Sequence, residues 1–432
     1  MFKSLISALK DKSIRKKILM VLLFVFIYRL GCYLPVPGLN MDTYSDLVSN
    51  DSVGLLSLLN TVTGSALSNA AFFALGVTPY INASIIVQLL TAGIPKLAEK
   101  AKQGDQGREF INLFTKIVTL ILAVAQGVGI VLGYSDTLLP LFGENLKWLT
   151  GVMVVIFLVA GACFTMWIGD RITAQGLGNG LSILIFVGII STSAQSIANA
   201  IASVFTSITY LWELLAFAVM ALVVFALIVW VDGAERRIPV QYAKQVRGRK
   251  MYGGQSTHIP MKVNGTGVMP IIFATAIITF PSLIIGLIGG DTSTGFPAWW
   301  AKYMGTGTWL YSICVALLIL FFSYFYAQMQ FNPADVSLNI QQNGGFIPGI
   351  RAGKQTTDYL TRVSRRITLF GAIFLAFLAL VPSVVFSFVA GGQLSLLNAF
   401  TATGMLIVVS VALEIKQQLD AQLMMKRHKN IL

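Results

Sequence analysis

The residues that could carry catalysis or bind a metal are few and poorly spaced for either role. The three cysteines, Cys32, Cys163 and Cys314, all lie in apolar stretches. The two histidines, His258 and His428, lie far apart in polar segments. Neither set has the spacing of a zinc site or of a disulfide framework. We therefore predict no metal site, and we assign the cysteines to apolar packing.

Two glycine-rich stretches come close to nucleotide-binding patterns but miss their requirements. In "GIRAGKQ" at 349–355, Pro348 stands where the first glycine of a phosphate-binding loop belongs, and no Ser or Thr follows Lys354. The stretch "GLGNG" at 176–180 has the wrong spacing for a dinucleotide fingerprint. No nucleophile with a partner base is evident either. The prediction is a protein that is not an enzyme, with no catalytic residue, no cofactor and no direct small-molecule substrate.

One apolar stretch contains polar groups that need an explanation. The residues "LSNAAFFALGVTPYINASIIVQLL" at 67–90 are apolar enough to enter a membrane, yet they include Gly76, Pro79, Asn82 and Gln88. A proline inside a helix removes one backbone hydrogen bond, and lipid cannot satisfy the freed carbonyl. The break at Pro79 is therefore expected to face protein or a water-filled cavity. The alternative for the amides is static hydrogen bonding between packed helices, which we favour for Gln88 taken alone.

The composition places this stretch in a polytopic membrane protein. Of the 432 residues 56% are hydrophobic and only 11% are charged, whereas a soluble domain has about 25% charged residues. The basic N-terminus runs into the first apolar segment without a cleavage site, so no cleavable signal peptide is predicted. Ten apolar segments are long enough to span a bilayer: 18–36, 70–93, 111–133, 148–168, 178–198, 211–231, 267–289, 307–329, 367–389 and 396–414.

The distribution of basic residues gives the orientation of these spans. Nearly all of the 31 Lys and Arg lie on one side of the spans or near the adjoining helix ends. The opposite loops hold only Lys147 and Lys302, and Arg29 lies inside the first span. The positive-inside rule then places both termini in the cytoplasm. The net charge of +13 is therefore mostly a topology signal.

Two cytoplasmic loops, at 232–266 and 330–366, are longer and more basic than topology requires. Their length and charge suggest a docking surface for an acidic or RNA-rich partner. The alternative is a solvated face held at anionic lipid.

A short internal echo suggests two related halves. The stretch "GVTPYI" at 76–81 lies in the second span, and "GVMPII" at 267–272 lies in the seventh. These spans are the second members of two five-span halves, 1–200 and 201–432. Because five is odd, the halves insert with opposite topology. Opposed repeats with glycine- and proline-interrupted helices point to a pathway at the interface between the halves.

The residues along this pathway indicate what kind of cargo passes. No mid-span Asp or Glu is available for ion coupling, and Arg29 is expected to snorkel or to pair locally. A passage lined by aliphatic and amide groups can resist ions and still yield to a larger cargo. The alternative is an inverted-repeat small-solute transporter, which requires a substrate or coupling-ion site that the sequence does not show.

Five long motifs occur in the order found in one known family. They are "ALGVTPYINASIIVQLL" (74–90), "GLGNGLSILIF" (176–186), "YAKQVRGRKMYGGQSTHIPMKVN" (242–264), "FNPADVSLNIQQNGGFIPGIRAGKQT" (331–356) and "MLIVVSVALE" (405–414). Across essentially the whole chain, the sequence closely resembles the SecY family, the channel subunits of the bacterial Sec protein translocase. The resemblance implies an all-α integral membrane protein whose ten transmembrane helices form two inverted five-helix halves. These halves form a clamshell around a central pore.

The resemblance also implies roles for residues at matching motif positions. It implies an aliphatic pore ring of Val77, Ile81, Leu181, Ile185, Ile272 and Ile407. A plug is implied at 52–66, with Leu55, Leu56, Leu58, Leu59, Asn60 and Gly64; an ordinary amphipathic loop helix is the alternative. A lateral gate is implied between the second and seventh spans, with Asn82 facing Phe280 and with Gln88 nearby. The implied docking residues for the ribosome or the ATPase SecA are Arg247, Arg249, Lys250 and Arg351.

The implied function is that of a passive protein-conducting channel in the bacterial plasma membrane. It passes unfolded secretory proteins across the membrane and releases transmembrane segments sideways into lipid, with energy from SecA or the ribosome. The expected companions are the membrane subunits SecE and SecG, signal peptides, nascent chains and membrane lipid. A third interpretation is an accessory SecY-like channel for restricted cargo, and the well-preserved loops argue against it.

Overall fold

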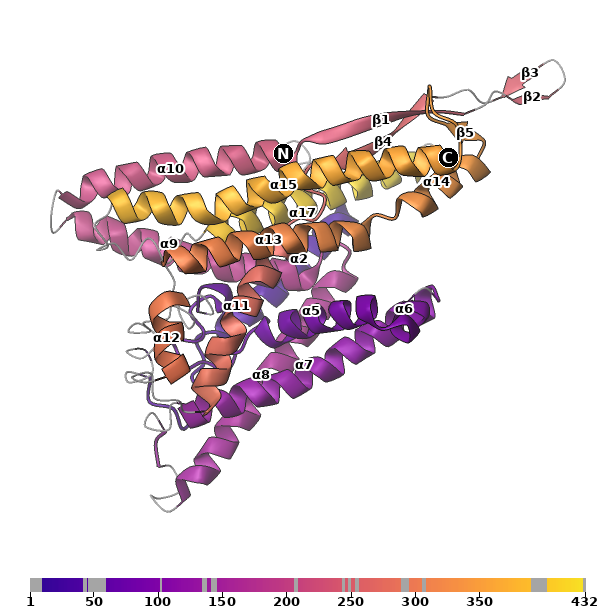
Figure 1. The fold of residues 1–432 in the computed structure, drawn as a ribbon. Coiled ribbons are helices and arrows are strands. Elements are labelled where there is room, and N and C mark those ends of the chain that lie inside the picture. The colour runs from indigo at the N-terminus through magenta and orange to yellow at the C-terminus, as the bar shows by residue number, and fades with distance from the viewer. Residues whose placement is uncertain are drawn as a thin grey trace.

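The computed structural model is a bundle of long helices with a small β-structure at one end (Figure 1). It describes residues 10–41, 45, 60–101, 103–133, 138–140, 146–205, 209–242, 245–247, 250–252, 256–288, 295–304, 308–389 and 402–429. Every predicted span overlaps a helix: α2 (Lys12–Gly31), α5 (Thr78–Gly93), α7 (Asp105–Gly133), α8 (Lys147–Ala174), α9 (Gly180–Val204), α10 (Thr209–Asp232), α11 (Met269–Ile288), α13 (Trp309–Gln330), α15 (Lys354–Val389) and α17 (Ala402–Lys429). The predicted architecture of ten membrane helices is confirmed.

Length and apolar composition support membrane crossing for most of these helices individually. Among the described residues, six helices are long and apolar enough to cross a membrane. A seventh span is counted when α5 is joined to the short helix α6 (Pro95–Ala101), which is bent from it by 106°.

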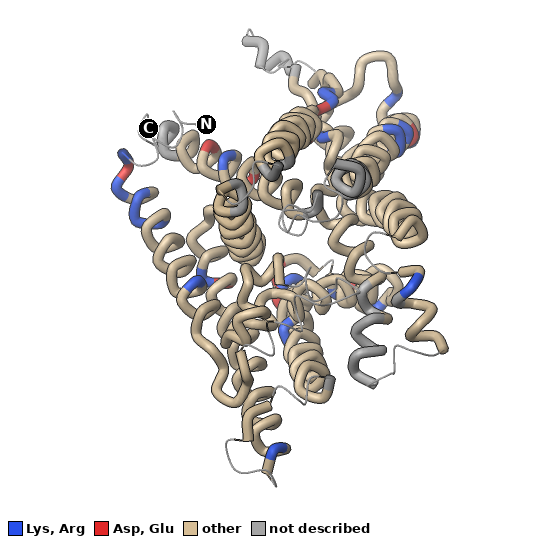
Figure 2. Tube along the Cα trace, turned by 90° about the vertical axis from the view of Figure 1, so that its left-hand side faces the viewer, with Lys and Arg blue, Asp and Glu red and all other residues tan. Residues whose placement is uncertain are grey.

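The outward faces of the helices carry large apolar side chains. Trp212 and Leu222 of α10 are 71% and 70% exposed, and Phe321 of α13 is 62% exposed. Figure 2 shows long uncharged stretches of chain separated by short charged segments. An apolar surface of this kind is unfavourable in water and is matched by lipid hydrocarbon. The outer surface of the bundle therefore faces the membrane.

The second span begins later than the sequence indicated, and this changes the meaning of Pro79. The helix α5 starts at Thr78, and residues 66–77 before it form a series of turns and one bridge. Pro79 thus lies in the first turn, where a helix needs no backbone N–H donor. The prediction of a break at Pro79 inside a helix is wrong. The sharp bend in this region lies at the other end of α5, before Pro95.

The internal echo corresponds to a repeated backbone structure. Gly76 and Gly267 both have positive φ, +50° and +62°, and each precedes a helix that starts two residues later. The amide of each glycine donates to the carbonyl three residues before it. In each case the valine that follows the glycine accepts hydrogen bonds from the first turn of the helix. The six-residue pattern is therefore a helix-start motif, used once in each predicted half.

Two apolar clusters are the largest among the described residues. The first cluster joins α2, α8 and α9 to α17, and its members include Tyr28, Ile168, Leu184 and Ile407. The second cluster joins α10, α11, α13 and α15 to α17, and its members include Ile228, Phe273, Ile319 and Leu406. Because α17 contributes to both clusters, it is packed into both predicted halves.

The two long loops fold together and contain strands that the sequence analysis did not predict. Strands β1 (Glu235–Tyr242) and β4 (Ser256–Lys262) pair antiparallel, and β5 (Gly345–Phe346) of the second loop pairs with the other edge of β1. Under this sheet, residues of both loops and of the helices α14 (Pro333–Gln342) and α15 form one cluster, with Ile238, Val240, Met261, Ile340, Ile347 and Leu360 buried. A second hairpin of β2 (Gln245–Arg247) and β3 (Lys250–Tyr252) projects beyond the helices (Figure 1).

Candidate functional site

Five of the six predicted ring residues lie in α5, α9, α11 and α17, and Val77 directly precedes α5. Four of the six are buried members of the first cluster: Val77, Leu181, Ile185 and Ile407. Ile81, one turn into α5, packs against both clusters, and Ile272 of α11 packs against the second. Ile81 is thus the one of the six that packs against both clusters, and the role of all six as a pore ring stays a prediction.

One residue beside the ring was missed in the sequence. Val268 packs against both clusters, as Ile81 does. It follows Gly267 in the echo motif, as Val77 follows Gly76. Comparing the two copies of the motif position by position would have identified it.

At the described end of the predicted plug, local hydrogen bonds stabilise the backbone turn that follows residue 60. Residues 60–63 are helical, and the side-chain carboxamide of Asn60 accepts from the backbone N–H of Ser68 at 2.9 Å. The Asn60 carbonyl accepts from the N–H of Ser65, also at 2.9 Å. Four predicted plug residues, Leu55, Leu56, Leu58 and Leu59, lie outside the described residues.

Two glycines allow this segment to lie directly on α9. A Cβ atom on Gly64 would lie 2.9 Å from the Cα of Gly188, and one on Gly188 would lie 2.6 Å from the carbonyl oxygen of Val62. Gly64 also has a φ of +71°, which residues with side chains rarely adopt. The plug assignment of Gly64 thus falls on a position that requires glycine for two reasons.

Arg29, whose role the sequence left open, contacts this same segment. Its Nη1 donates to the carbonyl oxygen of Gly64 at 3.0 Å, and its Nη2 donates to the hydroxyl of Tyr33 at 3.1 Å. The expected local pairing is therefore present in the contact with Tyr33. The contact with Gly64 reaches across to a segment far away in the sequence.

The predicted gate residues flank one stripe of α5. Ile81, Ile85 and Leu89 recur every four residues and all pack into or against the second cluster. Asn82 and Gln88 lie on opposite sides of this stripe, and both are partly exposed. Phe280 lies in α11, but its side chain is outside the described part of the structure, so its pairing with Asn82 stays a prediction.

Gln88 forms its hydrogen bond within its own helix. Its Nε2 donates to the hydroxyl oxygen of Ser84 at 3.1 Å, and its buried Oε1 has no partner among the described residues. Between the predicted halves, α11 packs against α7, a helix that the predicted seam does not include, while α5 reaches the second cluster through its apolar stripe.

The turn around Arg351, a predicted docking residue, has its backbone held by side-chain hydrogen bonds, and the Arg351 side chain is exposed. Gly349 and Gly353 have φ values of +81° and +97°, and the buried Thr356 donates its hydroxyl to the Arg351 carbonyl at 2.9 Å. The Ser337 hydroxyl donates to the Gly353 carbonyl at 3.0 Å. The Arg351 side chain is exposed and has no ion-pair partner in the described chain.

Two other predicted docking residues lie in the projecting hairpin. Arg247 and Lys250 belong to β2 and β3, where the backbone is described and the side chains are not. Arg249 lies outside the described residues.

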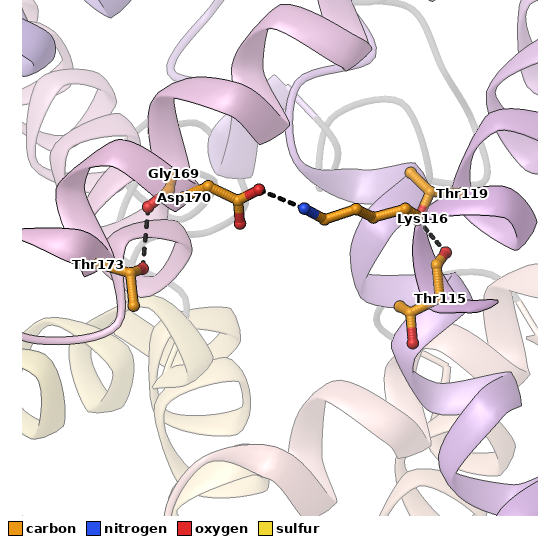
Figure 3. A network of polar contacts seen from close by, with 6 residues as sticks. All are labelled: Thr115, Lys116, Thr119, Gly169, Asp170 and Thr173. Atoms are coloured by element: carbon orange, nitrogen blue, oxygen red, sulfur yellow. Dashed lines mark hydrogen bonds and ion pairs between the residues drawn. The ribbon is translucent and has the colours of Figure 1, made fainter. Parts of the chain in front are cut away.

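A further polar network links α7, α8 and α9, and Figure 3 shows its members on α7 and α8. Lys116 of α7 points across to Asp170 of α8, and the Nζ to Oδ2 distance is 2.6 Å. Thr173 donates its hydroxyl to the Gly169 carbonyl and accepts from the N–H of Gly180 at the start of α9. Because both charged side chains are nearly half exposed, the ion pair contributes at most about 1 kcal/mol. The network therefore contributes little to the stability of the bundle.

Comparison with known proteins places this geometry in a family. The sequence model of the SecY family matches residues 71–416. The chain is 39% identical over 437 residues to the protein translocase subunit SecY of Streptomyces galbus, with 98% of each chain covered.

Solved structures share the fold. One described as "The structure of a protein conducting channel" aligns with a TM-score of 0.64 at 19% identity, covering 93% of this chain and 91% of that one. Another, "Sec61 in the Canine ribosome-channel complex from the endoplasmic reticulum", aligns with a TM-score of 0.60 at 17% identity, covering 93% and 90%. At these identities the likeness concerns the fold alone, and it agrees with the predicted ten-helix clamshell.

Proposed function

We propose how this chain, which belongs to the SecY family and forms the protein-conducting channel of a Sec translocase, closes and opens its pore. An aliphatic ring seals the pore, and a lateral seam between the two halves opens toward lipid. The observation that carries the proposal is the position of Ile81, which packs against both apolar clusters. The solute-transporter alternative is not favoured, because the matching proteins are translocase subunits over their full length.

The ring acts as a seal through the chemistry of its side chains. Aliphatic groups around a narrow passage disfavour water, so ions that need hydration are excluded. An unfolded polypeptide supplies its own apolar and polar surface and displaces these side chains as it enters. The seal therefore needs no binding site that is specific for one cargo.

The seam is supported by the stripe of α5 that faces the second cluster. Ile81, Ile85 and Leu89 hold α5 against the C-terminal half through apolar contacts. A hydrophobic signal helix offers the same kind of contact, so it can replace α5 on that surface. Asn82, beside the stripe, weakens apolar packing in the closed state and lowers the free energy needed to open it.

Replacing Asn82 with leucine is expected to stabilise the closed seam and to impair export behind weakly hydrophobic signals. An amide contact in a membrane helix contributes about 0.6 kcal/mol, up to roughly 2. A signal opens the gate only through its stronger binding to the open state, so strong signals are less affected. The measurement is export of one passenger protein behind a graded series of signal hydrophobicities.

Gln88→Leu is the matched control for this experiment. It removes an amide from the same helix, but that amide donates within α5. We expect small losses that are uniform across the series. If Asn82→Leu also lowers export equally for all signals, Asn82 serves static packing and the gate role is wrong.

Partners supply the energy and complete the channel. We propose that the ribosome or SecA docks on the folded pair of basic loops, including Arg351 and the projecting hairpin. A channel of the same fold is described in a ribosome complex, which supports the ribosome as a partner, and the choice of this surface rests on its exposed basic side chains. SecE and SecG are the proposed membrane companions. Co-purification of a SecE-like single-span protein tests this assembly, and its absence would count against it.

The proposed location is the bacterial plasma membrane, with both termini in the cytoplasm. The chain is a multi-pass membrane protein of a family that includes bacterial translocase subunits. The positive-inside rule supports the orientation, because the basic loops and both basic ends lie on one side of the spans.

A further inference from the structure

Arg29 is a charged residue in the last turn of α2, and the eleven residues before it, 18–28, carry no charge. Charged groups within membrane spans are costly and usually mark a functional contact. Arg29 is partly buried, and its guanidinium faces the carbonyl oxygen of Gly64 and the hydroxyl of Tyr33. Neither partner is a carboxylate, so the guanidinium is bound to neutral acceptors.

The segment that Arg29 contacts is held from two sides. On the α2 side, Tyr28 and Cys32 approach the Thr63 carbonyl oxygen at 3.5 and 3.8 Å, beside the stronger contact of Arg29 with Gly64. On the α9 side, the hydroxyl of Thr192 lies 3.5 Å from the Thr61 carbonyl oxygen. The short guanidinium bond is the only one of these contacts that involves a full charge.

The position of this bond also has an electrostatic reason. Residues 60–63 form one helical turn, and the carbonyls at the C-terminal end of such a turn carry partial negative charge. A cation at that end is therefore favoured. An arginine suits the site better than a lysine, because its planar fork can donate to two acceptors in fixed directions.

We propose that Arg29 is a positioning residue that latches segment 60–65 between α2 and α9 and so keeps the resting channel closed. The inference rests on the proposed plug function of this segment. The latch is reversible because its acceptor is a neutral carbonyl and because Arg29 is partly exposed, so water can replace the carbonyl when the segment moves. Opening of the channel then includes the loss of the contact between Arg29 and Gly64.

The test measures the position of the segment and the seal separately. The reporter is a cysteine introduced by Val62→Cys, whose rate of reaction with a membrane-impermeant thiol reagent measures the accessibility of the segment. Cys163 and Cys314 are replaced by alanine in all variants, and Cys32 is retained because it is buried. Ion conductance of the purified complex in planar bilayers, without precursor, reports the seal. Both are compared in wild type, Arg29→Met, Arg29→Gln and the control Tyr33→Phe, which leaves the bond to Gly64 in place.

We expect Arg29→Met and Arg29→Gln to raise the labelling rate about tenfold or more, from the loss of a charge-assisted hydrogen bond, and to raise the conductance in parallel. Tyr33→Phe is expected to behave as wild type. Unchanged labelling in the Arg29 variants overturns the latch, as does failure of both to accumulate while Tyr33→Phe accumulates, because Arg29 then serves folding. Faster labelling without a rise in conductance keeps the latch and rejects the plug function instead.

Discussion

Replacing Ile81 and Ile272 together with serine is expected to make the resting channel conduct ions. These residues occupy matching positions in the two copies of the helix-start motif, and both pack against the second cluster. Burial of an isoleucine side chain contributes about 1.5–3 kcal/mol. Replacing two isoleucines with serine therefore shifts the equilibrium between the dry and the water-filled constriction toward the water-filled state by at least about tenfold. Conductance of the reconstituted channel in planar bilayers, without precursor, measures the effect.

A second double variant controls for the chemistry of the substitution. Ile156 of α8 and Ile313 of α13 are 62% and 47% exposed on the outside of the bundle, one in each predicted half. Their replacement by serine changes the same residue type twice without touching the proposed ring. We expect its conductance to remain at the wild-type level. Equal conductance in both double variants and in the wild type would remove Ile81 and Ile272 from the seal.

The ten helices could be predicted from sequence because a bilayer requires long apolar segments, and few other structures produce them. The residue at which α5 begins could not be predicted from the sequence. Residues 70–77 are as apolar as the helix that follows, and hydropathy does not separate them. They form turns because their backbone makes hydrogen bonds with a distant segment of the chain. The backbone N–H of Phe72 donates to the carbonyl oxygen of Leu34, and the N–H of Val36 donates to the carbonyl oxygen of Ala70. Pro79 therefore begins a helix, although the apolar pattern suggested that it interrupts one.

The loop structure and the contact of Arg29 were missed for a related reason. Strand β1 pairs with Gly345 and Phe346 of the other long loop, and a single sequence does not reveal pairing across that separation. Arg29 was recognised as unusual, but its acceptor is the backbone of Gly64, which has no side-chain signal. The ring and docking residues are predicted from family motifs. For those that are described, the structure shows where each residue lies and whether its side chain is exposed, but it does not test their roles.

Reversing the charge at Arg351 is expected to abolish most SecA-driven transport while leaving the channel folded. The side chain is exposed, and its backbone is held by Thr356, whose hydroxyl bond does not depend on the side chain at 351. Arg351→Glu therefore removes no described contact within the chain. Loss of one partner of an interfacial charge pair costs about 2–5 kcal/mol, so transport of a secreted precursor should fall by more than about tenfold. Precursor transport into vesicles containing equal amounts of each variant measures the effect.

Arg362→Glu separates the position of the charge from the net charge of the loop. Arg362 lies in α15 near the same surface and is also exposed, so its reversal changes the charge of the loop by the same amount. If docking depends on the geometry of the turn between Gly349 and Gly353, Arg362→Glu loses little and Arg351→Lys recovers part of the activity. If docking depends only on total charge, the two reversals have equal effects. Normal transport by Arg351→Glu, or failure of that variant to accumulate in the membrane, shows that Arg351 is not a docking residue.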